Sequence, residues 1–167
     1  MPTELDLLFE KNINRLAGSL DKVLQSAQDE YKRLRKAGQK GELTHIYISF
    51  LLSGVLCKLP WLRVDLCDEN ERSDMTECSF VWDVQSISDK LYRDADMLKK
   101  QNDMIKDFES EQAWLDASDN YFRGFEKHLP QILSQCPTVK AVDCRWHFGQ
   151  FFGKTAVVRE KNKDDVL

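Results

Sequence analysis

The most constraining feature of this chain is an apolar run that ends near Pro60 and an alternating segment that follows it. Within Glu42–Cys57, apolar residues recur at helical spacing around most of the circumference, which predicts a buried central helix. Within Trp61–Cys67, apolar and polar residues alternate, which predicts a strand with one face toward the core. The chain is therefore expected to combine helices with strands.

The N-terminal segment has the pattern of a long amphipathic helix. Thr3 and Asp6 are placed to form a capping box, and apolar residues then recur every third or fourth position from Phe9 to Leu34. The Phe9–Leu34 stripe is expected to pack against its own domain, because polar residues and Gly18 interrupt its heptads. A homo-oligomer built on the same stripe is the alternative.

The second half of the chain alternates between helical and strand patterns. Apolar residues at helical spacing predict one helix from about Ser86 to Phe108 and another after Ser110, joined as antiparallel neighbours at Glu109–Glu111. Alternation predicts strands near 61–67, 78–83, 140–148 and 154–159. The first two strands are expected to form a hairpin across a polar turn.

These elements predict an α+β fold. A long N-terminal helix, a buried central helix and an antiparallel helical pair would pack on a small antiparallel sheet. Residues 1–159 are expected to form this single domain, and residues 160–167 a charged, disordered tail. A domain of this size can bury about 70% of its unfolded surface without disulfides or metals.

Charge and cysteine usage exclude several classes of protein. A net charge of -4 argues against sequence-independent binding to nucleic acid or to anionic membranes, which need concentrated positive charge. The apolar run is shorter than the ~20 residues that a membrane-spanning helix needs. Five cysteines without a C-x-x-C pair, and an N-terminus without a signal pattern, predict a cytoplasmic protein. Cys57, Cys67 and Cys78 are expected to act as small buried hydrophobes.

Candidate catalytic residues are few. Asp65 lies mid-strand before an acidic turn and Asp83 lies beyond it, so two carboxylates could act as acid and base or bind a divalent cation. The same acidic residues also suit a solvated turn, since the alternating spacing of a calcium loop is absent. His45 begins a stripe with Ser49 and Ser53, but no orienting group or oxyanion donor can be named for it.

No metal or cofactor is expected from the motifs. The histidines His45, His128 and His147 lie on different predicted elements and lack metal-ligand spacing. The segment Gly149–Thr155 ends like a phosphate-binding loop, but only three residues separate its glycines and no helix is expected to follow. We therefore predict a glycine-bounded hairpin turn there.

One set of residues resembles a known family. Tyr47–Leu51, Pro60–Leu66, Asp68-Glu69, Glu77-Cys78, Trp82-Asp83, Phe148-Gly149-Gln150 and Gly153-Lys154 together resemble an uncharacterised family of bacterial cytosolic proteins. The resemblance implies a bacterial cytoplasmic protein, and it implies no activity and no site residues.

Two adjacent aromatic residues near the end of the chain point to recognition. Phe151 and Phe152 are adjacent in the predicted turn and cannot both face one interior, so one of them is expected to be exposed as an anchor for a partner. Glu69 and Glu71 of the acidic 68–77 turn are further candidate contacts. We therefore expect a non-catalytic protein-interaction or accessory module. The alternatives are a carboxylate-based enzyme, with or without a divalent metal, and a homo-oligomeric structural protein.

Overall fold

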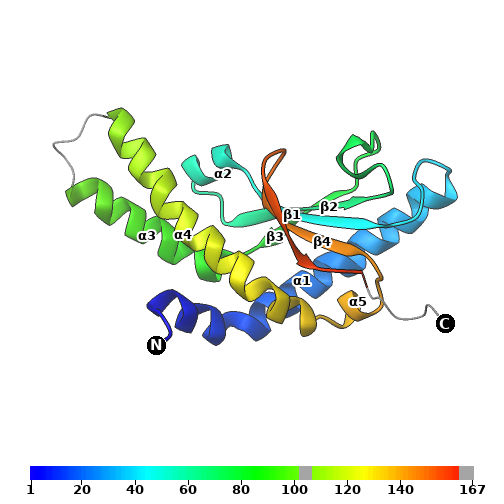
Figure 1. Ribbon diagram of the computed structural model, residues 1–167, viewed down its shortest axis with the longest axis horizontal. Coiled ribbons are helices and arrows are strands. Elements are labelled where there is room, and N and C mark those ends of the chain that lie inside the picture. The colour runs from blue at the N-terminus through cyan, green and yellow to red at the C-terminus, as the bar shows by residue number, and fades with distance from the viewer. Residues whose placement is uncertain (102–106, 162–167) are drawn as a thin grey trace.

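The computed structural model describes residues 1–101 and 107–161. Its elements, in chain order, are α1 (Glu4–Lys36), β1 (His45–Phe50), α2 (Leu52–Leu56), β2 (Trp61–Cys67), the 3-10 helix η1 (Glu71–Ser73), β3 (Ser79–Asp83), α3 (Gln85–Gln101), α4 (Asp107–Ser134), α5 (Pro137–Lys140), β4 (Arg145–Gln150) and β5 (Thr155–Arg159) (Figure 1). The predicted α+β class and the long N-terminal helix are both confirmed.

The strands form one five-stranded sheet in the order β3-β2-β1-β4-β5. The expected hairpin is present, since β2 and β3 pair antiparallel. The central pair β1 and β4 runs parallel, however, so the sheet is mixed and the prediction of an antiparallel sheet was wrong at this pair. A parallel pair needs a long connection, and here α2 to α5 and two strands lie between β1 and β4.

Residues 45–50 form the central strand β1, so the predicted buried central helix was wrong. Ile46 and Ile48 point into the core, while Tyr47 and Ser49 on the other face are also buried. The sequence of a strand that is covered on both faces is a nearly continuous apolar run. Such a run is difficult to distinguish from the sequence of a buried helix. Only the five residues of α2 in the predicted segment are helical.

Helix α1 forms as the sequence indicates. The Thr3 side chain accepts a hydrogen bond from the Asp6 backbone, and the Asp6 carboxylate accepts one from the Thr3 backbone, which confirms the capping box. The helix ends before Gly38, whose φ of 71° suits the residue without a side chain. The apolar side chains of the Phe9–Leu34 stripe are buried in the core of their own domain.

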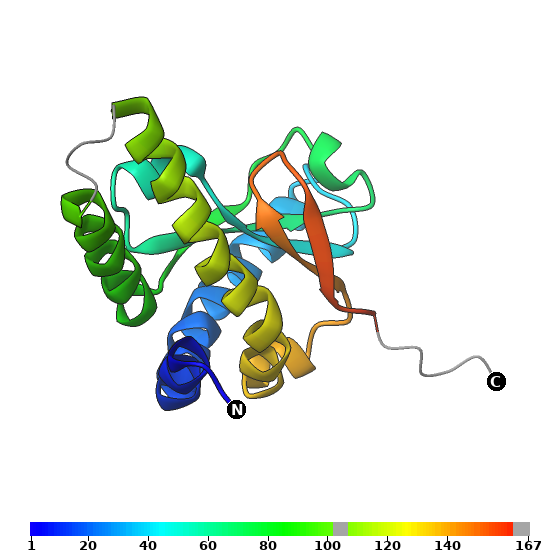
Figure 2. The ribbon, with the colours of Figure 1, turned by 60° about the vertical axis from the view of Figure 1, so that its left-hand side comes forward.

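The long helices α1 and α4 lie on the same side of the sheet (Figure 1). Helix α3 packs alongside α4, as the predicted helical pair requires (Figure 2). The predicted junction at Glu109–Glu111 lies inside α4, because α3 ends at Gln101 and α4 begins at Asp107. Most of the predicted tail, residues 162–167, lies outside the described residues.

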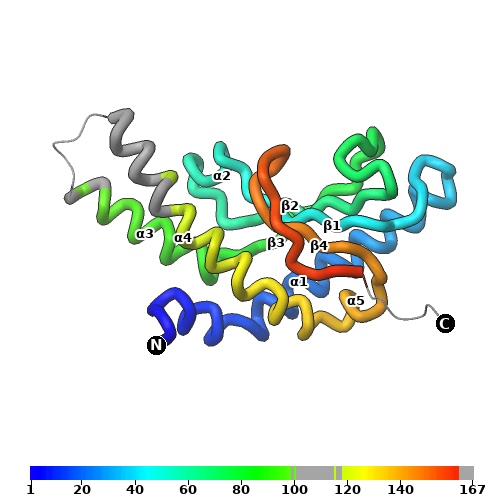
Figure 3. Tube along the Cα trace, in the orientation of Figure 1, coloured from blue at the N-terminus to red at the C-terminus, as the bar shows by residue number. Residues whose placement is uncertain are grey.

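The other side of the sheet, which we call the open face, carries neither of these long helices. Side chains at alternate strand positions, including Tyr47, Ser49, Arg63 and Asp65, belong to it. The 68–77 segment and the β4–β5 turn rise on this side (Figure 3).

Two predictions about solvent exposure have different outcomes. Cys67 and Cys78 are buried as expected, but Cys57 is exposed. Cys57 follows the short helix α2 and does not lie at the end of a buried central helix, as the sequence had suggested.

Among the described residues, no helix combines the length and the apolar composition needed to span a membrane.

Candidate functional site

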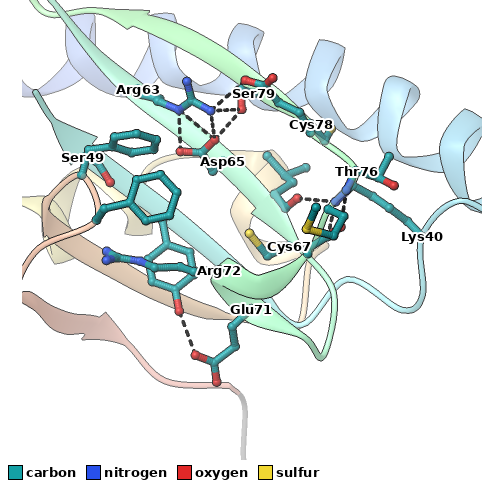
Figure 4. Close-up of a pocket in the computed structure, with 17 residues that line it drawn as sticks. Lys40, Ser49, Arg63, Asp65, Cys67, Glu71, Arg72, Thr76, Cys78 and Ser79 are labelled. Atoms are coloured by element: carbon teal, nitrogen blue, oxygen red, sulfur yellow. Dashed lines mark hydrogen bonds and ion pairs between the residues drawn. The ribbon is translucent and has the colours of Figure 1, made fainter.

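A cleft of about 290 Å³ opens on this face of the sheet (Figure 4). Strands β1 and β2 form its floor, the 68–77 segment forms one wall, and the β4–β5 turn forms the other. We call it the sheet cleft. Its lining residues are Lys40, Tyr47, Ser49, Arg63, Asp65, Leu66, Cys67, Glu71, Arg72, Asp74, Met75, Thr76, Glu77, Cys78, Ser79, Phe151 and Phe152.

Ser49 lies on the floor of the sheet cleft. It pairs with Arg63 of β2 on one side and with Gly149 of β4 on the other. Its side chain is 0% exposed, and the hydroxyl has no hydrogen-bond partner among the described residues. A Cβ at Gly149 would lie only 2.2 Å from the carbonyl oxygen of Lys154, so glycine lets the β4–β5 turn fold closely beside Ser49.

The β4–β5 turn contributes two phenylalanine rings. Phe151 is partly buried, and its ring centre lies 4.4 Å from the guanidinium carbon of Arg63. Phe152 is 71% exposed, which confirms that one of the two rings faces solvent. Their centroids are 4.3 Å apart in an edge-to-face arrangement. The aromatic wall of the cleft therefore consists of one ring held by a cation and one ring left open.

Arg63 is held in the cleft through its Nε and Nη2 groups. Its Nε donates to the Asp65 carboxylate at 2.9 Å, and its Nη2 donates to Glu77 at 2.8 Å and to the Ser79 hydroxyl at 2.7 Å. Ser79 also donates to Asp65, and Figure 4 shows these three groups gathered between β2 and β3. Two carboxylates thus more than offset the single positive charge of Arg63.

A second polar group joins β1, β4 and η1. Nδ1 of His45 lies 3.0 Å from Nε2 of His147, and the Tyr47 ring stacks on His147 with centroids 4.2 Å apart. The Tyr47 hydroxyl donates to Glu71 at 3.1 Å. Burial, together with the nearby charge of His45, lowers the pKa of His147 from 6.5 to about 4. Folding therefore favours the uncharged imidazole of His147 over the protonated form.

Arg72 connects the two walls of the sheet cleft. Its guanidinium carbon lies 4.7 Å from the ring centre of Tyr47, and its Nη1 donates to the Gly153 carbonyl at 3.0 Å. Its Nη2 is buried and has no hydrogen-bond partner among the described residues. The preceding residue, Glu71, has a φ of 53°, an uncommon conformation for a residue with a side chain.

The three catalytic candidates are not brought together. Asp65 lies in the sheet cleft and is bound by Arg63, whereas His45 does not line the cleft and contacts His147 instead. Asp83 lies opposite Trp61 at the far end of the hairpin, about 13 Å along the strand from Asp65. There it accepts a hydrogen bond from the backbone N–H of Gln85 at the start of α3. These positions do not form one acid–base site.

Three of the four candidate partner contacts line the sheet cleft, namely Phe151, Phe152 and Glu71. Glu69 is exposed but does not line it; its carboxylate lies beside Gly41. The sequence did not identify Arg72, Tyr47 and Ser49 as residues that line the sheet cleft. The alternation of His45, Tyr47 and Ser49 with Ile46, Ile48 and Phe50 was the signal that could have placed them on a strand.

The described part of the chain holds no group of three or more His, Cys, Asp or Glu side chains arranged to bind a metal ion. Comparisons with protein-family models, with curated proteins and with solved structures found no match to this chain. The chemistry of the sheet cleft is therefore the basis for a functional proposal.

Proposed function

We propose that this protein is a non-catalytic protein-interaction module that binds a partner at the sheet cleft. The observation that carries the proposal is Phe152, a large apolar side chain that is 71% exposed at the rim of the cleft. Exposed aromatic side chains beside a pocket are frequent anchors of protein interfaces. Phe151 and the 68–77 segment provide further surface around it.

The conformation of the turn supports this role. Phe152 has a φ of 53°, which costs a residue with a side chain roughly 1–2 kcal/mol. Backbone hydrogen bonds from Phe151 to Phe50 at 2.9 Å and from Gly153 to Gln150 at 2.9 Å hold the turn in place. A backbone that is already held in place loses little conformational entropy when the turn binds.

The alternatives receive less support from the contacts. Asp65, the best-placed carboxylate for acid–base chemistry, is occupied by Arg63 and Ser79, and Asp83 lies at another end of the sheet. The Phe9–Leu34 stripe, which would build a homo-oligomer, is covered by the core of its own domain. The sheet cleft lies on the open face, which neither α1 nor α4 covers.

Truncating Phe152 is expected to remove the bound partner. We predict that Phe152→Ala lowers the recovery of a co-purifying protein by about tenfold or more, because aromatic anchors often contribute 2 kcal/mol or more to binding. The measurement is quantitative affinity purification, with mass spectrometry, of the wild type and the variant at equal expression. Met97→Ala is the matched control, because Met97 is also exposed but lies on α3, away from the cleft.

The control should retain every protein that the wild type retains. If the double variant Phe151→Ala/Phe152→Ala recovers the same proteins at the same level as Met97→Ala, the sheet cleft is not the binding surface.

A further inference from the structure

The charged side chains that line the sheet cleft do not cancel one another. Four of the lining residues are carboxylates and three are cations, which leaves one negative charge in excess. The 68–77 segment, which forms one wall, contains five carboxylates and a single arginine. The whole chain also has a net charge of -4. The electrostatics of the cleft therefore favour a positively charged ligand over an anion.

The cations of the cleft are largely withdrawn from solvent. The side chain of Lys40 is 1% exposed and that of Arg63 is 26% exposed. Arg72 is partly buried, and its Nη2 atom is buried. Each of the three also lies over an aromatic ring of the protein, with 4.4 to 5.3 Å between the charged group and the ring centre. These cations therefore present little positive surface to a ligand.

Two carboxylates of the same lining are open to solvent. The side chain of Glu71 is 53% exposed and that of Glu77 is 69% exposed. Glu77 shares the single charge of Arg63 with Asp65. Glu71 lies 3.4 Å from Nε2 of His45, which is charged only when it is protonated. Since a carboxylate can accept about four hydrogen bonds, both glutamates can still bind a cation.

Phe152 adds an open aromatic ring on the opposite wall. It is 71% exposed, and among the described residues no cation lies over its ring. The faces of phenylalanine rings attract lysine and arginine side chains. Met75, which is 96% exposed in the cleft lining, offers apolar surface to the methylene groups of such a side chain. The accessible parts of the cleft thus combine negative charge with aromatic and apolar surface.

We infer that the sheet cleft binds a lysine or arginine side chain on a basic segment of the partner protein. The cationic group of this side chain pairs with Glu71 and Glu77. Its methylene groups pack against Phe152 and Met75. Arg63 shows the same combination within the protein, because its guanidinium contacts a phenylalanine ring and two carboxylates. The inference rests on the proposed function, since it names the chemistry of the partner that enters the cleft.

The size of the cleft suits one side chain and not a larger molecule. Its volume of about 290 Å³ lies at the lower limit of ligand pockets. The rest of the basic segment stays outside, beside the acidic 68–77 segment. Glu69, which is exposed there and does not line the cleft, extends the negative surface. Several positive charges on the partner can therefore contribute to binding.

Titration of isotope-labelled protein with short peptides, followed by NMR, tests the inference. The probes are acetylated and amidated peptides of equal length that carry arginine, lysine, citrulline, acetyl-lysine or glutamate at the same positions. Citrulline and acetyl-lysine remove the charge of arginine and lysine. We expect both basic peptides to bind, and their uncharged counterparts to bind at least about tenfold more weakly, because charge-assisted hydrogen bonds are lost. The glutamate peptide should not bind.

Two glutamine variants locate the binding site. Glu71→Gln and Glu77→Gln are each expected to weaken binding of the arginine peptide about three- to fivefold, as is typical of exposed charge pairs. The double variant should weaken it about tenfold or more. Glu10→Gln is the matched control, because it removes the same charge from an exposed position on α1 outside the cleft. Added salt should weaken binding to the wild type more than to the double variant.

The outcomes distinguish the inference from the function on which it rests. The inference is overturned if neither basic peptide binds, if charged and uncharged peptides bind equally, or if the double variant binds as tightly as Glu10→Gln. If Phe152-dependent partner capture persists in these cases, the proposed function stands without the inference. N-acetylarginine amide is the small-cation probe and should bind more weakly than the peptide. If it binds as tightly, and capture does not depend on Phe152, the ligand is a small cation and both proposals fail.

Discussion

Lys40→Ala is expected to lower the free energy of unfolding by about 3–5 kcal/mol. Lys40 is almost fully buried, and its ammonium group donates to the Leu66 carbonyl at 3.1 Å and forms an ion pair with Asp74. Removing it leaves the buried carboxylate of Asp74 without its cation, which costs far more than the pair itself contributes. Chemical denaturation of the wild type and the variant measures the change.

A second ion pair provides the matched control. Lys58 and Asp96 are joined at 2.7 Å, but both side chains are roughly half exposed. Lys58→Ala should therefore change the free energy of unfolding by less than about 1 kcal/mol. If both lysine variants show the same small effect, Lys40 does not anchor the 68–77 segment against the sheet.

Acidification from neutral pH should destabilise the protein through His147. Its pKa is about 4 in the folded protein and 6.5 as a free side chain, so the unfolded chain binds more protons between these values. The contribution of His147 to the free energy of unfolding is therefore fully present above pH 6.5. It decreases by up to about 3 kcal/mol as the pH falls toward 4. Urea denaturation at several pH values across this range measures the slope.

The variant His147→Phe identifies the source of this pH dependence. A phenyl ring can keep the stacking contact with Tyr47 and does not titrate, so the slope between pH 6.5 and 4 should be markedly reduced. The carboxylate of Asp6 is not expected to cause the slope between pH 6.5 and 4. Hydrogen bonds from Lys127, Thr3 and His128 lower its pKa below the usual 3.8, so its contribution is lost only in stronger acid. An unchanged slope in His147→Phe would show that other groups cause it.

Local sequence patterns were sufficient for the elements with a single buried face. The Thr3 and Asp6 capping box and the Phe9–Leu34 stripe predicted α1, and alternation in Trp61–Cys67 predicted β2. Each of these elements has one face toward the core and a polar face beside it. Their periodicity is therefore visible without knowledge of the neighbouring elements.

The centre of the sheet could not be predicted in the same way. Strand β1 is paired on both edges and covered on both faces, so its burial pattern depends on β2, β4 and the cleft walls. The error at β1 also concealed the floor of the sheet cleft, because Tyr47 and Ser49 were placed on a helix. Arg72 reaches the cleft through contacts with Tyr47 and with Gly153, which is 81 residues away in sequence. No local pattern records such contacts.

The central claim is that a protein partner binds at the sheet cleft, and site-specific crosslinking tests it most directly. A photo-reactive phenylalanine analogue replaces Phe152 in one sample and Met97 in another, and both are irradiated in the native host. Both positions are exposed, but only Phe152 lies at the cleft. We predict a crosslinked partner protein from position 152 and none from position 97. Crosslinks from position 97 alone, or none from position 152, would contradict it.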